Sequence, residues 1–245
     1  MGISKRCSRM SRQAHSTRPA GPITRIFRGI QQLRLTTAVI LFVLIIPTTV
    51  FADKIEISSF SQGILDAWKP RLFNGKTDYQ IVLKDGQQVL QADSRNAASG
   101  LVRTIRVDLR RTPYLHWRWK ISRLPPNSGE KTKSADDFPV RVYLIQSAGL
   151  AFWNSRALNY VWSATAPVDT WWPNPYTGKA IMLAVESGPA ATGKWREYHR
   201  NVQEDFKKTF GVTPESINSV AIMTDTDNTG ISVTAWYGDL YFSDQ

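Results

Sequence analysis

The chain has very little cysteine and histidine. Its single cysteine, Cys7, lies close to the N-terminus, so residues 53–245 can form no disulfide and supply no thiolate nucleophile or thiolate metal ligand. Of the three histidines, only His116 and His199 lie after residue 52. The sequence also contains no G-x-S-x-G and no H-E-x-x-H motif. These absences count against nucleophilic catalysis with a histidine base and against a histidine zinc site.

Acidic residues are absent from the first 52 positions. That segment carries eight Lys or Arg residues, then the apolar run 35–46, Pro47 and the tripeptide Val50-Phe51-Ala52. A basic region, a short apolar run and a small residue at the cleavage point are the parts of a secretory signal, and the run is short for a membrane span. We therefore expect residues 1–52 to be a signal peptide and N-terminal leader, with an uncleaved signal-anchor as the alternative. The protein is then exported, periplasmic or extracellular, with no membrane span after cleavage.

The leader also accounts for most of the net charge. The full chain carries 31 Lys and Arg against 20 Asp and Glu, a formal charge of +11. Without the eight leader charges, 23 basic residues remain against the same 20 acidic ones, a balance of +3. A nearly balanced chain lacks the basic excess typical of nucleic-acid binding, so we expect no nucleic-acid partner. Residues 53–245 are long enough for a single domain with a sizeable core.

Most of this domain shows alternation of apolar and polar residues with period two, which is typical of strands. In residues 114–121, Leu115, Trp117 and Trp119 fall on one face and polar side chains on the other. The dipeptide Asp85-Gly86 predicts a tight hairpin turn. We expect strands at residues 55–60, 79–84, 87–92, 100–108, 114–121, 139–146, 157–165, 180–187, 217–224 and 232–242.

One segment has helical periodicity instead. Trp195, Tyr198, Val202, Phe206 and Phe210 recur at spacings of three and four and predict an amphipathic helix over about 195–210. The glycine that follows is a natural stop for such a helix. Many strands with a lone helix predict an all-β fold, an antiparallel β-sandwich of jelly-roll type.

The acidic turn at residues 225–230 has the spacing of the first half of a calcium loop. Asp225, Asp227 and Thr229 occupy positions 1, 3 and 5, and Gly230 occupies position 6. The twelfth position, where an EF-hand needs a glutamate, is Trp236. We expect no cofactor, but a Ca²⁺ held by Asp225, Asp227 and Thr229 is an alternative. The turn also has a purely structural interpretation, because Asp and Asn side chains stabilise turns through the backbone.

Paired carboxylates offer a second interpretation. Asp136 and Asp137 precede one predicted strand, and Asp225 and Asp227 follow another. Glycoside hydrolysis needs two carboxyl groups at a defined separation, one of them with a raised pKa. These four residues are therefore the candidate catalytic residues if the protein is an enzyme, although carboxylates at strand ends are more often turn or cap residues.

Aromatic residues are the remaining signal. Several gather between residues 152 and 176: Phe152, Trp153, Tyr160, Trp162, Trp171, Trp172 and Tyr176. Two prolines stiffen the segment 171–178, which we expect to be a rigid loop. Aromatic rings beside polar groups suit the apolar faces of sugars, and a tryptophan-rich core is the alternative. The predicted ligand-binding residues are Arg118, Arg141, Tyr143, Tyr160, Trp171, Trp172, Asn174 and Tyr176.

Five blocks of the sequence carry a further signal: residues 136–143, 159–162, 172–176, 221–230 and 235–239. Together they resemble a bacterial family of exported proteins, domain of unknown function 3047. The resemblance covers nearly all of the chain after the leader. It implies a sandwich similar to galactose-binding and carbohydrate-binding modules, and it assigns no catalytic residue.

These observations lead to one hypothesis and two alternatives. We expect an exported β-sandwich that binds a glycan, such as a cell-envelope polysaccharide, or another polar ligand without catalysis. The first alternative is a carbohydrate-active hydrolase that uses two of the four aspartates. The second is an envelope scaffold whose fold calcium stabilises.

Overall fold

Two β-sheets packed face to face make up the structure, a computed structural model that describes residues 53–126, 129–147 and 155–245. The predicted all-β sandwich is therefore confirmed. The predicted leader, residues 1–52, lies outside the described residues, as do Phe152 and Trp153. In the described ranges no helix combines the length and apolar character needed to cross a membrane.

The first sheet, here called sheet I, has the strand order β1-β14-β6-β13-β4-β3 among the described residues, and β11 pairs with β6 beside this path. All of its pairs are antiparallel. Its strands are β1 (Lys54–Glu56), β3 (Asp78–Lys84), β4 (Gln87–Arg95), β6 (Tyr114–Ile121), β11 (Arg196–Asn201), β13 (Ser232–Tyr237) and β14 (Tyr241–Ser243).

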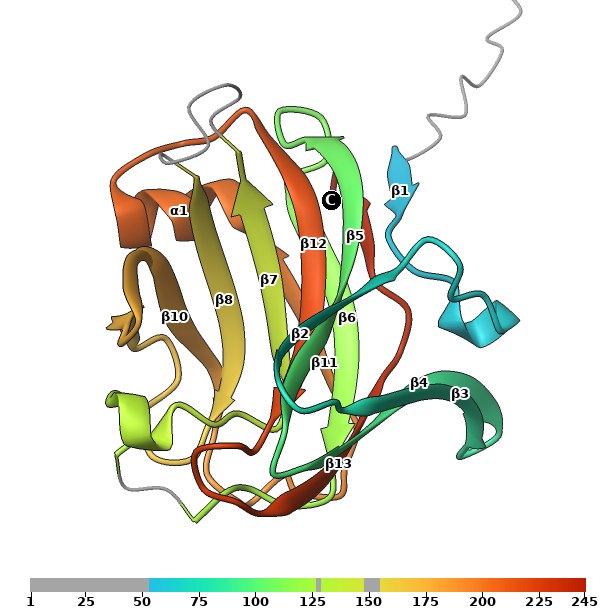
Figure 1. Cartoon of the computed structure of the whole chain (residues 1–245). Helices are drawn as coiled ribbons and strands as arrows, with labels where there is room; N and C mark the ends of the chain where they lie inside the picture. Colours follow the sequence, from blue (N-terminus) through green and yellow to red (C-terminus); the bar gives the residue numbers. More distant parts are fainter. Residues whose placement is uncertain (1–52, 127–128, 148–154) are drawn as a thin grey trace, which may run out of the picture. The chain divides into compact units, whose positions relative to one another are not determined.

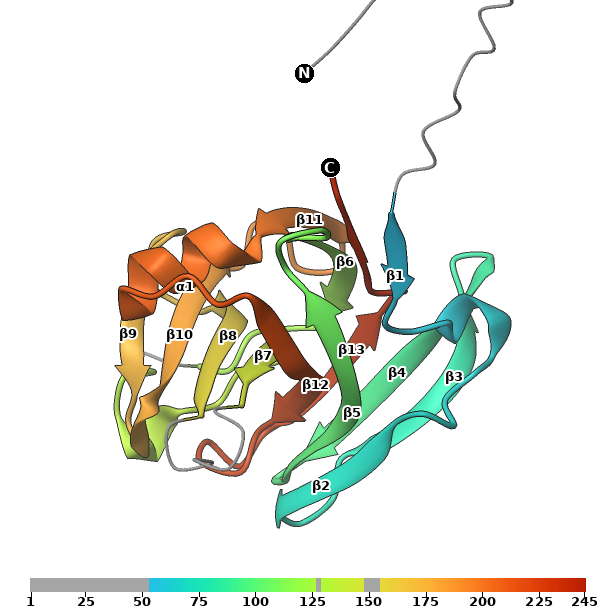
Figure 2. The same ribbon diagram turned by 90° about the horizontal axis from the view of Figure 1, so that it is seen from above.

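The second sheet, sheet II, has the order β2-β5-β12-β7-β8-β10-β9 among the described residues. Its central strands lie in front of β6 and β11 in Figure 1. Seen from above, β2 and the β3–β4 hairpin extend to the side opposite β9 and β10 (Figure 2). Its strands are β2 (Lys69–Asn74), β5 (Ala98–Asp108), β7 (Arg141–Gln146), β8 (Arg156–Ser163), β9 (Trp171–Asn174), β10 (Thr177–Ser187) and β12 (Ser216–Asp225).

The core lies between the sheets and follows the period-two pattern. In β6, Leu115, Trp117, Trp119 and Ile121 are buried and alternate with half-buried polar side chains, as expected. The hairpin between β3 and β4 turns at Asp85 and Gly86, whose φ angles of 51° and 81° are both left-handed. The register between β5 and β12 shifts between Ile217 and Ser219, which marks a bulge or irregularity in this pair.

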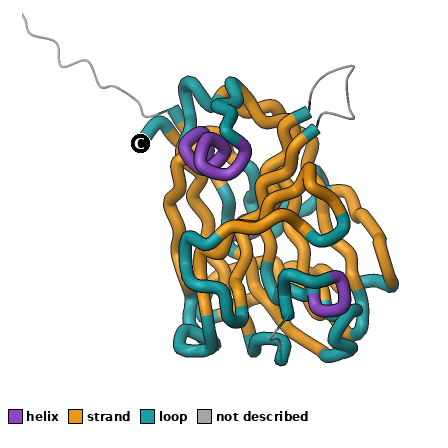
Figure 3. Tube along the Cα trace, turned by 90° about the vertical axis from the view of Figure 1, so that its left-hand side faces the viewer, coloured by secondary structure: helices purple, strands orange, loops and turns teal. Residues whose placement is uncertain are grey.

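The predicted helix is only half helical. Helix α1 covers Val202–Phe210, lies at one end of the strands (Figure 3) and ends at Gly211, whose φ is 70°. Residues 196–201 form β11 instead, paired with β6 in a continuous antiparallel register. The ring of Tyr198 stacks on Trp117 at a centroid distance of 4.9 Å. Backbone pairing and this contact override the helical spacing, and the Asn201 side chain begins the helix by accepting a bond from the Glu204 N–H at 3.3 Å.

Three further details differ from the sequence prediction. Strands β8 and β10 pair in parallel within an otherwise antiparallel sandwich. The segment 171–178, expected to be a loop, forms β9, a turn and the start of β10. The predicted strand 232–242 divides into β13 and β14 around Gly238, where an added Cβ would lie 2.5 Å from the Arg118 side chain. Two short 3-10 turns, Phe60–Gln62 and Lys133–Ala135, complete the described elements.

Candidate functional site

A cavity of about 470 Å³ opens on the outer face of sheet II, the face turned away from sheet I. In β7, Val142 and Leu144 belong to the core, so Arg141 and Tyr143 project outward. The same alternation brings Asn159 of β8 and Asp225 of β12 to the outer face. The cavity is lined by Phe73, Asn74, Ala98, Asp136, Arg141, Tyr143, Asn159, Asn174, Tyr176, Thr177, Ala180, Met223, Asp225, Asp227 and Asn228.

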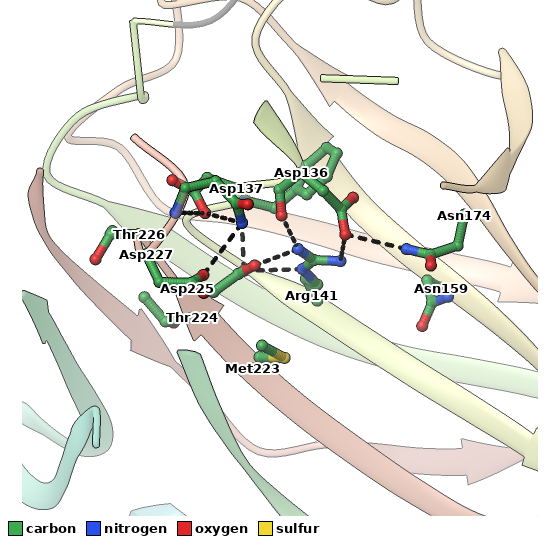
Figure 4. A network of polar contacts seen from close by, with 12 residues as sticks. Asp136, Asp137, Arg141, Asn159, Asn174, Met223, Thr224, Asp225, Thr226 and Asp227 are labelled. Carbon is green, nitrogen blue, oxygen red and sulfur yellow. Dashed lines mark hydrogen bonds and ion pairs between the residues drawn. The ribbon is translucent and has the colours of Figure 1, made fainter. Parts of the chain in front are cut away.

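A buried ion pair forms one wall of the cavity. Arg141 and Asp225 are only 1% and 2% exposed. Arg141 donates from Nε to Asp225 Oδ1 at 2.9 Å and from Nη2 to Asp225 Oδ2. Nη2 also donates to the carbonyl of Asp136, and Nη1 lies 3.5 Å from Asp136 Oδ2. Figure 4 shows Arg141 between the two carboxylates, a bidentate arrangement on one side with a weaker contact on the other.

Burial and the guanidinium group act on these carboxylates in opposite directions. Burial raises the pKa of Asp225 to about 7, and the charge of Arg141 opposes the shift. Burial also raises the pKa of Asp136, and the charge of Arg141 again opposes the shift. The charge of Arg141 therefore lowers the cost of keeping two carboxyl groups inside the protein.

Asp137 has a different role, because it holds the acidic turn. Its Oδ1 accepts hydrogen bonds from the backbone N–H and the side chain of Asn228, at 3.1 and 3.2 Å. Its Oδ2 accepts from the backbone N–H and hydroxyl of Thr229, both at 2.6 Å. Both oxygens are thus engaged by the turn, which supports the structural interpretation of this segment.

The predicted metal ligands are only partly brought together. Asp225 and Asp227 lie near each other, with Asp137 as a third carboxylate, and the three offer oxygens within 4.8 Å of one another. The Thr229 hydroxyl donates to Asp137. The donor set is a chemical match for Ca²⁺, which prefers carboxylate oxygens, but Asp137 and Asp225 already accept hydrogen bonds from the protein.

Chelation tests whether the fold depends on a Ca²⁺ ion bound by these carboxylates. We expect EDTA to leave the melting temperature unchanged in thermal denaturation, because protein donors already compensate the charges of Asp137 and Asp225. A rise of several degrees on adding Ca²⁺, lost in Asp227→Asn, would contradict this expectation and support the calcium alternative. Asp78→Asn, which changes a carboxylate on β3 in sheet I, serves as the matched control.

Two residues of the cavity keep an acceptor without a partner. Oδ1 of Asp136 and Oδ1 of Asn159 are buried and have no hydrogen-bond partner among the described residues. Asn174 orients Asp136 by donating to its Oδ2 at 3.1 Å. Asn159 donates from Nδ2 to the carbonyl of Ile181 at 3.3 Å, which leaves its oxygen as the free group. Buried polar atoms without partners are rare in proteins and mark positions where a bound group can add hydrogen bonds.

Comparison with known proteins places the chain in a family. The family described as "Protein of unknown function (DUF3047)" matches residues 66–241, well over half of the sequence. The chain belongs to the DUF3047 family. The resemblance predicted from the sequence blocks is thus confirmed. No curated protein matches this sequence.

Solved structures similar to this DUF3047 chain come from carbohydrate-related proteins. The family 30 carbohydrate-binding module of a cellulosomal cellulase of Clostridium thermocellum gives a TM-score of 0.44 at 11% identity, covering 78% of this chain and 98% of the module. The endoglucanase Cel12A from Rhodothermus marinus gives the same score and identity, covering 78% and 96%. The CBM22-1 xylan-binding domain from Paenibacillus barcinonensis Xyn10C gives 0.38 at 11%, covering 79% and 96%.

Four of the predicted ligand-binding residues line the cavity of this DUF3047 protein: Arg141, Tyr143, Asn174 and Tyr176. Arg141 faces the cavity, but each of its three guanidinium nitrogens already donates to an oxygen of Asp225 or Asp136. The Asn174 oxygen accepts from the Tyr176 N–H at 3.0 Å, and its amide nitrogen donates to Asp136. Asn174 therefore fixes both the turn between β9 and β10 and the side chain of Asp136.

The other four predicted residues lie elsewhere, and two of them require correction. Tyr160 is fully buried between the sheets, where its hydroxyl donates to Asp205 at 2.7 Å, so it cannot contact a ligand. Trp172 is 5% exposed and packs against Phe138. Trp171 is 43% exposed on the edge strand β9. Arg118 lies on sheet I, where its guanidinium group stacks over Trp195 at 4.8 Å.

The sequence prediction missed several residues of the cavity. Asn159 stands alone as an amide within an apolar strand, which is the signal that could have identified it. Phe73, 65% exposed, belongs to β2, a strand that the periodicity did not predict. Met223 and Asn228 lie in the segment 221–230 but were considered only as part of a turn and its flanking strand.

Proposed function

We propose that this DUF3047 protein is an exported β-sandwich that binds a glycan chain on the outer face of sheet II without catalysis. The observation that carries the proposal is the cavity itself, where buried polar acceptors lie beside exposed aromatic rings. Its volume falls within the roughly 300–1,000 Å³ of typical ligand pockets. The basic and apolar pattern of residues 1–52 supports export, to the periplasm or beyond the cell.

The chemistry of the cavity suits a sugar. Phe73 and Tyr176 are 65% and 57% exposed, and both line the cavity. The apolar C–H face of a sugar ring can cover such rings, while its hydroxyl groups form hydrogen bonds with Asp136 and Asn159. Each of these oxygens gains a partner that the protein does not supply.

A second cavity extends the first along the same face. It has a volume of about 540 Å³ and shares Phe73, Tyr143 and Met223 with the first. Its remaining walls come from β2, β5, β7 and β12, and include Val102. A continuous depression of this kind accommodates a chain of several sugar units better than a single sugar.

Calorimetric titration with oligosaccharides of increasing length tests the proposal. We expect affinity to rise with length, and Phe73→Ala to weaken binding by about tenfold, since an aromatic contact contributes roughly 1 kcal/mol beyond the buried area. Leu83→Ala is the matched control, because Leu83 is 75% exposed but lies on β3 of sheet I. Val102→Trp should fill the second cavity and remove the dependence on length. The proposal fails if no glycan binds, or if both alanine variants behave alike.

The hydrolase alternative rests on the raised pKa values of Asp225 and Asp136, two neighbouring carboxyl groups in the cavity. Against it, Asp225 and Asp136 contact the same buried guanidinium group, and Asp137 is occupied by the turn. An assay for reducing ends, with Asp225→Asn as the variant, separates the two functions. Release of reducing ends by the unaltered protein alone would favour the hydrolase.

A further inference from the structure

The cavity carries more negative than positive charge. Three carboxylates line it, from Asp136, Asp225 and Asp227, against one guanidinium group, that of Arg141. Arg141 and Asp225 form a bidentate pair, so the charges of these two residues compensate each other. The carboxylate of Asp136 contacts Arg141 only at 3.5 Å, and Asp227 accepts from the neutral amides of Asn74 and Asn228.

Arg141 is poorly placed to bind an acidic ligand. Each of its three guanidinium nitrogens already contacts an oxygen of Asp225 or Asp136. Two basic side chains outside the cavity wall contact its rings: Lys133 lies over Tyr176 at 5.4 Å, and Arg71 lies over Phe73 at 5.9 Å. At the end of the cavity formed by Asp136 and Asn159, a carboxylate or sulfate on the ligand would therefore meet Asp136 beside a guanidinium group that already has oxygen partners.

The hydrogen-bonding atoms without partners also favour a ligand that donates hydrogen bonds. Asp136 Oδ1 and Asn159 Oδ1 are acceptors, on side chains that are 5% and 0% exposed. They belong to one cluster, because Asn159 and Asn174 both contact the sulfur of Met182, at 3.5 and 3.8 Å, and Asn174 donates to Asp136. Figure 4 shows the contact between Asn174 and the Asp136 carboxylate, with Asn159 drawn next to Asn174. This cluster lacks donors rather than acceptors.

From this geometry we propose that the end of the cavity formed by Asp136 and Asn159 recognises a free amino group, as carried by an amino sugar without its acetyl group. The inference rests on the proposed glycan binding and names the sugar class. An ammonium group brings three donors, no acceptor and a positive charge. It brings donors to this group of unpartnered oxygens and compensates the charge of Asp136. An N-acetyl group brings a carbonyl acceptor instead and has no charge.

Three oligosaccharide series with one linkage test the inference: β-1,4-linked glucosamine, N-acetylglucosamine and glucose. We expect calorimetry on the full chain to show glucosamine binding about tenfold tighter than the other two, the range of one charge-assisted hydrogen bond. Asp136→Asn should abolish this preference while neutral sugars still bind. Asp108→Asn removes a half-buried carboxylate that pairs with Arg110 away from the cavity and should change nothing, which controls for net charge.

A second variant guards against a folding defect in Asp136→Asn. Asn159→Leu keeps the branched shape and the number of heavy atoms of the buried side chain but removes its Oδ1 acceptor and its Nδ2 donor, and should lower glucosamine affinity with an unchanged circular dichroism spectrum. Equal affinity for glucose and glucosamine, or tighter binding of an acidic glycan, overturns the amino-group inference and leaves the proposed function intact. Absence of binding in all three series overturns both.

Discussion

Replacing Arg141 by methionine is expected to lower the free energy of unfolding by about 3–5 kcal/mol, the range for breaking a buried ion pair from one side. The reason is that Asp225, 2% exposed, would lose the bidentate partner that compensates its charge. Asp136 would lose its contact with Nη1 in the same change. Urea denaturation followed by tryptophan fluorescence measures the difference.

The matched control is Arg110→Met, because Arg110 forms similar contacts with Asp108 at an exposed position, with 58% of its side chain accessible. Exposed pairs contribute roughly 0–1 kcal/mol, so little change is expected there. The double variant Arg141→Met with Asp225→Leu removes both charges and should recover much of the lost stability. An Arg141→Met protein as stable as the control would show that Asp225 does not need its partner.

Local pattern was enough to predict the sandwich but not the exact limits of its elements. The alternation in β6 and the Asp85-Gly86 turn depend on neighbours in sequence, and both were predicted correctly. Residues 196–201 belong to a stretch with a helical spacing of apolar side chains, yet they pair with β6, which lies far away in sequence. Pairing with a distant strand overrides a weak local preference, and a single sequence carries little information about such pairing.

The candidate site shows the same limit. Asp136 and Arg141 are five residues apart, but Asp225 is 84 residues from Arg141. They meet because the register of β7 with β12 places Arg141 opposite Met223, two residues before Asp225. The types of residue in the site could be predicted from the sequence, but this register between two strands could not. Tyr160 was misassigned because its apolar strand has no clear alternation to show which face is buried.

Glu130 is the clearest case of an important residue without a sequence signal. It is 2% exposed, and its carboxylate accepts from the backbone N–H groups of Ala164 and Ala166 at 2.8 Å, and from that of Thr165 at 3.4 Å. The hydroxyls of Ser163 and Thr165 donate to it as well. The carboxylate thus connects the segment before Asp136 to the end of β8, and so helps to hold one wall of the cavity.

We expect Glu130→Gln to destabilise the fold by about 2–3 kcal/mol, since hydrogen bonds to a charged group contribute roughly 1.5–3 kcal/mol and the amide nitrogen cannot accept from the Ala164 N–H. Glu215→Gln is the control, because the Glu215 side chain is 72% exposed and contacts only the surface residue Arg110 among the ion pairs described. The two variants have the same change in charge and size, so the difference in their urea midpoints reports the buried hydrogen bonds. Since Glu130 holds the segment that contains Asp136, glycan affinity should fall with stability in Glu130→Gln and stay unchanged in Glu215→Gln. Equal midpoints for the two variants would show that the backbone of residues 164–166 finds other acceptors when the carboxylate is lost.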